Sequence, residues 1–249
     1  MKKNIILFIL IISHKINGQI KFGSVEYKQT TNVEIINERN LPKFELIKDF
    51  NEKYENATQR ISYSLHFNEN ESYFFANKIL LANDINFNLA ATAGRAKLKY
   101  YHNTLTNESR QYYDMPRTGI VIVNNQTIYE WTLIKETKII DKYKCYKATS
   151  PLYYKDKKLD TFVTAWYAPE IPVGYGPIGY GGLPGLILEL QNDRATFFVT
   201  KIDLTLNSEP EINKLLSPVA ISNQIFSDLI MGTLSREQLE GMEETDSKK

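Results

Sequence analysis

Few residues of this chain have the types and spacing that covalent chemistry requires. The sequence holds one cysteine, Cys145, and three histidines, His14, His66 and His102. A cysteine nucleophile needs a base within hydrogen-bond reach, usually a histidine. The pattern places His66 on the polar face of a strand and His102 at the end of a tyrosine-rich strand, and no signature brings either beside Cys145. We therefore expect Cys145 to be a buried, unreactive residue.

Two carboxylates flank a stretch rich in glycine and proline. Glu170 precedes it and Glu189 follows it, and a pair of carboxylates can perform acid–base catalysis. Glu189 alternates with leucines, however, which indicates the solvent face of a strand. A hydrolase that uses Glu170 with Lys147 or Tyr143 is the enzyme alternative. The chain has no G-x-S-x-G motif, and we predict no catalytic site.

Aromatic and basic residues offer candidates for binding. Trp166 and Tyr167 could line an apolar groove or belong to the core. The lysines between residues 135 and 147 could bind an anion, but the acidic residues among them favour a solvated strand face. The candidate binding residues are Trp166, Tyr167, Glu170, Pro177 and Lys147.

The composition argues against metal, cofactor and nucleic acid. Asn83, Asp84, Asn86 and Asn88 are the only faint set of oxygen ligands, and we interpret them as loop residues. Outside residues 1–18, which have the pattern of a signal peptide, the chain has only two histidines and one cysteine. These are too few for a typical zinc or copper site. Without residues 1–18, which carry three lysines and no acid, the net charge falls from +1 to −2. We therefore expect no metal, no cofactor and no nucleic-acid partner.

The first 18 residues have the pattern of a secretory signal peptide. Lys2 and Lys3 precede an apolar run over residues 5–12, and a short polar stretch leads to Gly18. The run is too short to span a bilayer, and no comparable run follows it. No cysteine lies just after this run for lipidation, because the only cysteine is Cys145. We expect a soluble periplasmic protein in which residues 19–249 form one domain with a charged, frayed C-terminal tail.

The elements that must position these residues are mostly strands. Alternating apolar residues mark strands over residues 21–31, 60–68 and 72–76, and eight further short strands are predicted between residues 97 and 204. A helix is predicted over residues 43–56, while residues 85–96 are expected to form a long loop. The pattern predicts a mainly β fold: a single-domain antiparallel sheet, strongly curved or a half-barrel, with a few peripheral helices.

The glycine- and proline-rich stretch predicts a shaped loop anchored by a buried strand. Residues 171–191 hold six glycines and three prolines and end in an apolar strand pattern. Glycine allows positive φ and proline fixes φ, so such a density of both specifies a backbone path. We expect Gly182 or Gly185 to have positive φ or to lie against another backbone. Leu183 and Leu186 should be buried.

The chain resembles the GLPGLI family of exported Bacteroidetes proteins. The resemblance is carried by the motif Gly182, Leu183, Pro184, Gly185, Leu186 and Ile187, together with Trp131, the run from Tyr143 to Ala148, Ala165-Trp166-Tyr167, Glu170-Ile171-Pro172 and Gly176-Pro177. The chain departs from the pattern at residues 157–160, where relatives often carry Gly-Arg. The resemblance implies export and a β-rich fold, and it implies no activity.

These observations favour a non-enzymatic binding or accessory protein. Its concave face or its loop would hold an apolar ligand or a partner protein of the cell envelope. A third interpretation makes the loop a structural plug that leaves no pocket.

Overall fold

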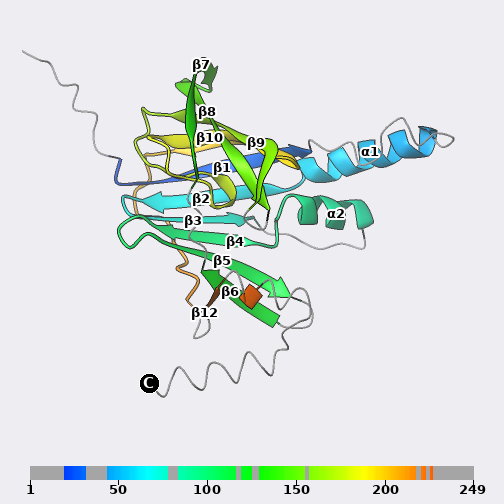
Figure 1. Ribbon diagram of the computed structural model, residues 1–249, viewed down its shortest axis with the longest axis horizontal. Coiled ribbons are helices and arrows are strands. Elements are labelled where there is room, and N and C mark those ends of the chain that lie inside the picture. Colours follow the sequence, from blue (N-terminus) through cyan, green and yellow to red (C-terminus); the bar gives the residue numbers. More distant parts are fainter. Residues whose placement is uncertain are drawn as a thin grey trace, which may run out of the picture.

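The residues that the structure describes form one twelve-stranded sheet and two α-helices (Figure 1). The computed structural model describes residues 20–31, 44–77, 84–115, 119–124, 129–154, 157–216, 220–222 and 225–226. The helices are α1 (Phe44–Gln59) and α2 (Ile85–Ala93). The strands are β1 (Phe22–Thr31), β2 (Ser62–Asn68), β3 (Glu71–Ala76), β4 (Lys99–Asn103), β5 (Glu108–Met115), β6 (Gly119–Asn124), β7 (Thr132–Ile140), β8 (Tyr143–Tyr154), β9 (Lys157–Ala168), β10 (Leu186–Gln191), β11 (Ala195–Asp203) and β12 (Ala220–Ser222).

The strand order confirms a mainly β, antiparallel fold. The order is β12-β6-β5-β4-β3-β2-β1-β11-β10-β9-β8-β7, and only β12 pairs in parallel, with β6. The expected half-barrel is wrong, because the sheet is neither closed nor strongly curled. Closure requires the two edge strands to meet, whereas β7 and β12 lie at opposite ends of the sheet (Figure 1). The accumulated twist is visible in the steep angle of β7 to β1.

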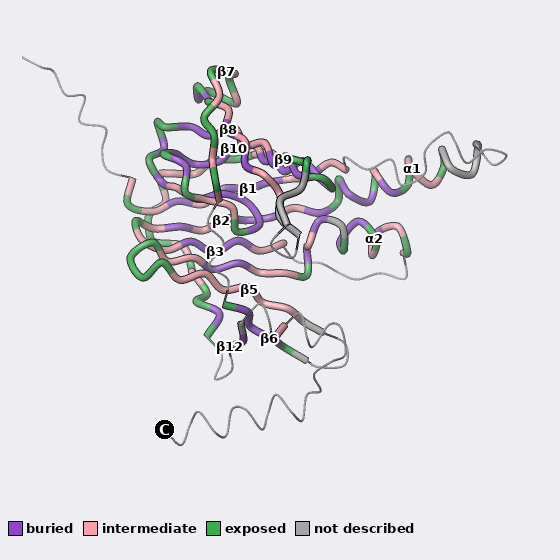
Figure 2. The backbone as a smooth tube through the Cα atoms, viewed as in Figure 1, coloured by how far each residue is buried: buried purple, intermediate pink, exposed green. Residues whose placement is uncertain are grey.

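One face of the sheet carries an aromatic core. Tyr63 of β2 stacks on Phe74 of β3 with 5.4 Å between ring centroids and meets Phe197 of β11 edge-on at 5.3 Å. Residues of α1 and α2 join this cluster, including Tyr54 and Ala90. Figure 2 shows the buried backbone concentrated in β1, β2 and their neighbours. We call the face covered by these helices the inner face.

The loop predicted over residues 85–96 is wrong for most of the segment, because residues 85–93 form α2. Asp84 caps α2, because its Oδ1 accepts hydrogen bonds from the backbone N–H groups of Asn86 (3.0 Å) and Phe87 (3.1 Å). Ala90 and Ala91 are fully buried and let the helix approach the sheet closely. Asp84 is therefore the N-cap residue of α2. The helix predicted over residues 43–56 is confirmed as α1.

The opposite face is covered in part by residues 204–216. Leu215 packs with Tyr73, Tyr101 and Ile122. Lys214 Nζ lies 2.7 Å from Glu71 Oε1, and the Tyr101 hydroxyl donates to the same oxygen at 2.6 Å. The chain thus ties its late segment to β3 and β4 before it reaches β12.

The predicted signal peptide at residues 1–18 and the charged residues 243–249 lie outside the described residues. Among the helices that the structure describes, none combines the length and apolar character of a membrane span. Cys145 is fully buried, as predicted.

Candidate functional site

Residues 171–185, here called the Gly/Pro loop, join β9 to β10 and fold back on themselves. The Leu186 N–H donates to the Ile171 carbonyl (2.9 Å), and the Gly182 N–H donates to the Gly174 carbonyl (2.9 Å). Ile171 is fully buried. These bonds close the loop at its base and near its tip, so its path is fixed by the backbone.

Two glycines have the roles that the sequence predicts. Gly182 has φ of +84°. A Cβ on Gly185 would lie 2.4 Å from the carbonyl oxygen of Ala168, a distance that no side chain tolerates. Leu183 and Leu186 are buried, at 3% and 0% exposure. The prediction for all four residues is confirmed, and the motif fastens the loop to the end of β9.

The tip of the loop contains a strained turn. Pro177, Ile178 and Gly179 form a short 3₁₀ turn in which Ile178 has φ of 47°. A β-branched residue rarely adopts this left-handed conformation, which costs about 1–3 kcal/mol. Ile178 is 2% exposed, so its buried side chain holds the turn in place. Gly179 lies against the ring of Tyr100 on β4.

Two residues before β7 clamp the tip from the other side. The indole N–H of Trp131 donates to the Gly181 carbonyl at 2.8 Å, and the Tyr129 hydroxyl donates to the Gly179 carbonyl at 3.3 Å. Tyr129 also stacks on Tyr180, with ring centroids 4.4 Å apart. The tip is therefore held between this segment and the inner face.

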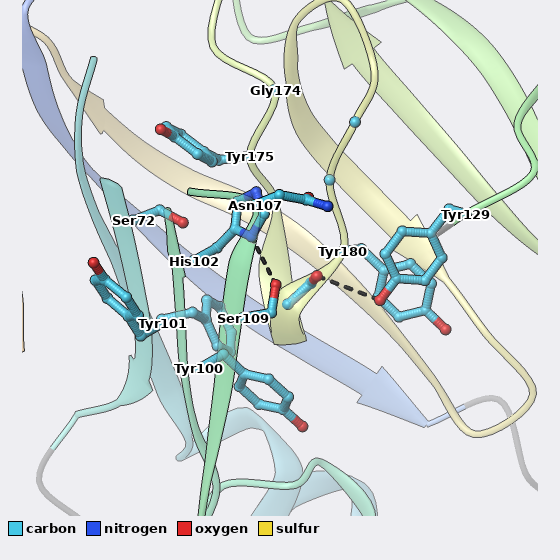
Figure 3. Close-up of a pocket in the computed structure, with 15 residues that line it drawn as sticks. Ser72, Tyr100, Tyr101, His102, Asn107, Ser109, Tyr129, Gly174, Tyr175 and Tyr180 are labelled. Atoms are coloured by element: carbon cyan, nitrogen blue, oxygen red, sulfur yellow. Dashed lines mark hydrogen bonds between the residues drawn. The ribbon is translucent and has the colours of Figure 1, made fainter. Parts of the chain in front are cut away.

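A cavity of about 260 Å³ lies between the Gly/Pro loop and strands β3 to β5, and we call it the loop pocket. The aromatic residues that line it are Phe74, Tyr100, Tyr129, Tyr175 and Tyr180, together with Tyr101, whose side chain lies on the opposite face of the sheet. Its small polar side chains are Ser72, His102, Asn107 and Ser109. Its glycines are Gly174, Gly176, Gly179, Gly181 and Gly182. Figure 3 shows Tyr175 on one side, Tyr129 and Tyr180 on the other, and His102, Asn107 and Ser109 between them.

The polar centre of the pocket is a histidine–serine pair on neighbouring strands. Ser72, His102 and Ser109 are cross-strand partners on β3, β4 and β5, so their side chains share the inner face. His102 Nδ1 lies 2.7 Å from Ser109 Oγ (Figure 3). Burial lowers the pKa of His102, and a bond to the Glu108 backbone acts in the opposite direction. The imidazole is therefore neutral at pH 7 and can accept or donate according to its tautomer.

Tyr175 forms a second wall over this pair. Its ring meets the ring of His102 edge-on at 6.3 Å and lies 6.0 Å from Phe67. Its hydroxyl donates to the Glu69 carbonyl at 3.4 Å. Burial raises the pKa of Tyr175 to about 12, so the phenol stays neutral and presents a polarisable face to the pocket.

The predicted binding residues fall in three places. Pro177 is buried in the loop tip beside the loop pocket. Trp166 lies outside that pocket, where Lys138 Nζ is 4.5 Å and Lys147 Nζ is 5.8 Å from its ring centroid. Lys147 Nζ forms an ion pair with Glu136 at 3.0 Å. Trp166 and Lys147 thus belong to a cation–π and ion-pair array on the sheet.

Tyr167 and Glu170 line a separate, shallower depression of about 250 Å³ with Lys144, Tyr146 and Pro169, here called the Tyr146 groove. Tyr146 and Tyr167 are cross-strand partners, with ring centroids 6.1 Å apart. The Lys144 N–H donates to Glu170 Oε1 at 3.5 Å. In the hydrolase alternative Glu170 works with Lys147 or Tyr143, but Lys147 pairs with Glu136 and Tyr143 does not line the groove.

Comparisons with known proteins support the fold and leave the chemistry open. A family model described as a protein of unknown function (Porph_ging) matches residues 154–189, which include the Gly/Pro loop and its motif. No curated protein matches the chain. Structures of PNGF-II in the C2 and P21 space groups are similar in fold, with TM-scores of 0.50 and 0.51, 14% and 15% sequence identity and 85% of this chain covered. The chain spans about a third (33%) of the length of those chains.

Proposed function

We propose that this chain is a non-enzymatic binding protein whose loop pocket holds a small ligand with an apolar face. The observation that carries the proposal is the pocket itself: a concave site between a fixed loop and the inner face, with aromatic walls and a few convergent polar groups. Ligand sites have this composition. The Gly/Pro loop encloses a cavity, which favours a binding role over a plug.

Rigidity of the loop supports the same function. The tip is held by Trp131 and Tyr129 on one side and by the buried side chain of Ile178 on the other. A wall that is already ordered loses little conformational entropy when a ligand arrives, and this improves affinity. The strained backbone of Ile178 has a function in this proposal, because its turn places Gly179 and Tyr180 in the wall of the loop pocket.

We further propose that the chain is a GLPGLI-family protein exported to the periplasm. The support is the motif at residues 182–187, the leader pattern at residues 1–18 and the match of an unknown-function family model to the segment that contains the motif. The region of PNGF-II that has a similar fold makes up a third of that longer chain. A fold that forms one part of a larger protein is consistent with an accessory role. Cell fractionation and N-terminal analysis of the exported protein test the processing after Gly18.

Native mass spectrometry tests the binding function. The protein is purified without denaturation from the envelope of its native cell, and its mass is compared with that of Ser109→Phe, which places a ring in the loop pocket. Tyr146→Ala is the matched control, because it alters the Tyr146 groove alone. Denaturant melts establish that both variants fold.

We expect a bound small molecule on the wild type and on Tyr146→Ala, and its loss from Ser109→Phe. A ligand lost only from Tyr146→Ala would contradict the assignment to the loop pocket. An unliganded chain that instead co-purifies with a stoichiometric partner protein would support the accessory alternative.

A further inference from the structure

The loop pocket contains polar groups without formal charge. Among the described residues that line it, the side chains are aromatic, hydroxyl, amide or imidazole, and none is an acid, a lysine or an arginine. His102 and Ser109 lie at its centre, 2.7 Å apart, with Asn107 beside them. The pocket can therefore hydrogen-bond a ligand, but these residues supply no counter-ion.

The charged residues nearest these positions in the sheet are engaged elsewhere. Glu71, next to Ser72, pairs with Lys214 and accepts from Tyr101. Arg110, next to Ser109, pairs with Glu108 and donates to the Lys214 carbonyl. The positive charge of Arg95 acts on the phenols of Tyr100, Tyr129 and Tyr180, but Arg95 does not line the loop pocket. An ion that entered the pocket would lose hydration without a partner charge among the lining residues, which is unfavourable in a buried site.

We propose that the loop pocket selects an uncharged ligand that has a flat ring and a hydroxyl or amide group. The ring would lie between Tyr175 and the Tyr129–Tyr180 stack, and the polar group would bond to the His102–Ser109 pair. This inference rests on the proposed binding function and specifies its ligand class.

The His102–Ser109 pair suits a hydroxyl or an amide, because such groups both donate and accept. The serine hydroxyl rotates, and the neutral imidazole has one donor and one acceptor nitrogen, so the pair adapts to either direction of bonding. Aromatic faces favour offset or edge-on contact with a ring. A flat ring with one neutral polar group matches both features.

The same geometry sets the pH dependence of binding. From β3, His102 faces Ser72; from β5, it faces Ser109 and the Glu108 backbone; from the loop, it faces the neutral phenol of Tyr175. None of these supplies a negative charge. A bound ligand removes water from His102 and so favours the neutral imidazole further. By linkage, protonation of His102 must weaken the binding of an uncharged ligand.

Three small molecules of matched shape test the ligand class: benzamide, benzoate and benzylamine. The reporter is Trp131, whose indole bonds to the pocket wall at Gly181, in a Trp166→Phe protein that has no other tryptophan. We expect benzamide to change the emission of Trp131 with a Kd about ten-fold or more below those of benzoate and benzylamine. Ser109→Phe should abolish the change, and Tyr146→Ala should keep it.

Acidification provides the second readout. The affinity for benzamide should stay level above about pH 7 and fall as the pH drops below about 6.5, since burial lowers the pKa of His102, and His102→Gln should bind with little pH dependence. Equal or tighter binding of benzoate or benzylamine overturns the ligand class while leaving the pocket a binding site. Failure of all three to bind overturns this inference, and the native ligand seen by mass spectrometry then decides the proposed function separately.

Discussion

The hydroxyl of Tyr27 donates a hydrogen bond to the carbonyl oxygen of Ile187 at 2.7 Å, across 160 positions of sequence. Tyr27 lies in β1 and is fully buried, and Ile187 is the second residue of β10, just after the Gly/Pro loop. Burial raises the pKa of Tyr27 far above its usual value, so the phenol remains a donor at all physiological pH values. This bond fastens the loop to the middle of the sheet.

Tyr27→Phe should destabilise the protein by about 1–3 kcal/mol, because it leaves a buried carbonyl without this donor. Urea melts at pH 7 measure the change. Tyr146→Phe is the control, since the side chain of Tyr146 is at the surface and removal of its hydroxyl should leave the stability unchanged. Equal midpoints for Tyr27→Phe and wild type would show that the bond does not fasten the loop.

The two motif glycines should differ in their cost of substitution. Gly185→Ala places a methyl group 2.4 Å from the Ala168 carbonyl oxygen, and backbone must move to accommodate it. We expect a loss of about 1–3 kcal/mol or more, as for overpacking. Gly182→Ala meets no atom within 4 Å but has φ of +84°, so conformational strain alone should cost about 1–2 kcal/mol. Denaturant melts compare the two variants, and a larger loss for Gly182→Ala would reverse this order.

The sequence predicts local elements better than their assembly. The period-two pattern of β2 and the density of glycine and proline at residues 171–191 identify a strand and a shaped loop, since both depend on nearby residues. Whether the sheet closes depends instead on the twist accumulated over all its strands, and no local sequence pattern predicts that total. Helix α2 was missed because its small, uncharged residues have no amphipathic period, although the Asp84 cap was visible.

Acid should weaken the attachment of residues 204–216. Hydrogen bonds from Lys214 and then Tyr101 lower the pKa of Glu71 below its usual 4.5. A carboxylate with a lowered folded-state pKa contributes stability above its unfolded pKa, and that contribution is lost as pH falls through the folded value. The wild type should therefore lose more stability than Glu71→Gln between neutral pH and pH values below 4.5.

Urea melts of both proteins across this range measure the difference. Glu136→Gln removes an acid whose side chain is 54% exposed, and it should leave the acid sensitivity of the wild type intact. If the free energy of unfolding fell by the same amount with pH in the wild type and in Glu71→Gln, this role of Glu71 would be ruled out.

Cys145 should react slowly in the folded protein. Burial raises the pKa of its thiol to about 11, so almost no thiolate forms at neutral pH. A chromogenic disulfide reagent should label the unfolded chain at least about 100-fold faster than the native one, because the reaction requires the exposed thiolate. Rapid labelling of the native protein would restore Cys145 as a candidate nucleophile.

The candidate site was predictable only in part. Pro177 and the motif glycines are marked by composition, and they shape the loop pocket or its anchor. His102 and Ser109 are seven positions apart and unremarkable in sequence; they meet because β4 and β5 pair in one register and because a loop some 70 residues later covers them. Trp166 and Lys147, by contrast, are residue types that the sequence marks as binding candidates, but they form a cation–π and ion-pair array away from the loop pocket.

A crystal structure of the protein purified from its native cell, without added ligand, would show directly whether the loop pocket holds a small molecule. We expect electron density for an uncharged molecule in the loop pocket, between Tyr175 and Tyr180 and in contact with His102 or Ser109. Ordered water alone in the loop pocket, together with a molecule bound against Tyr146 and Tyr167, would contradict it.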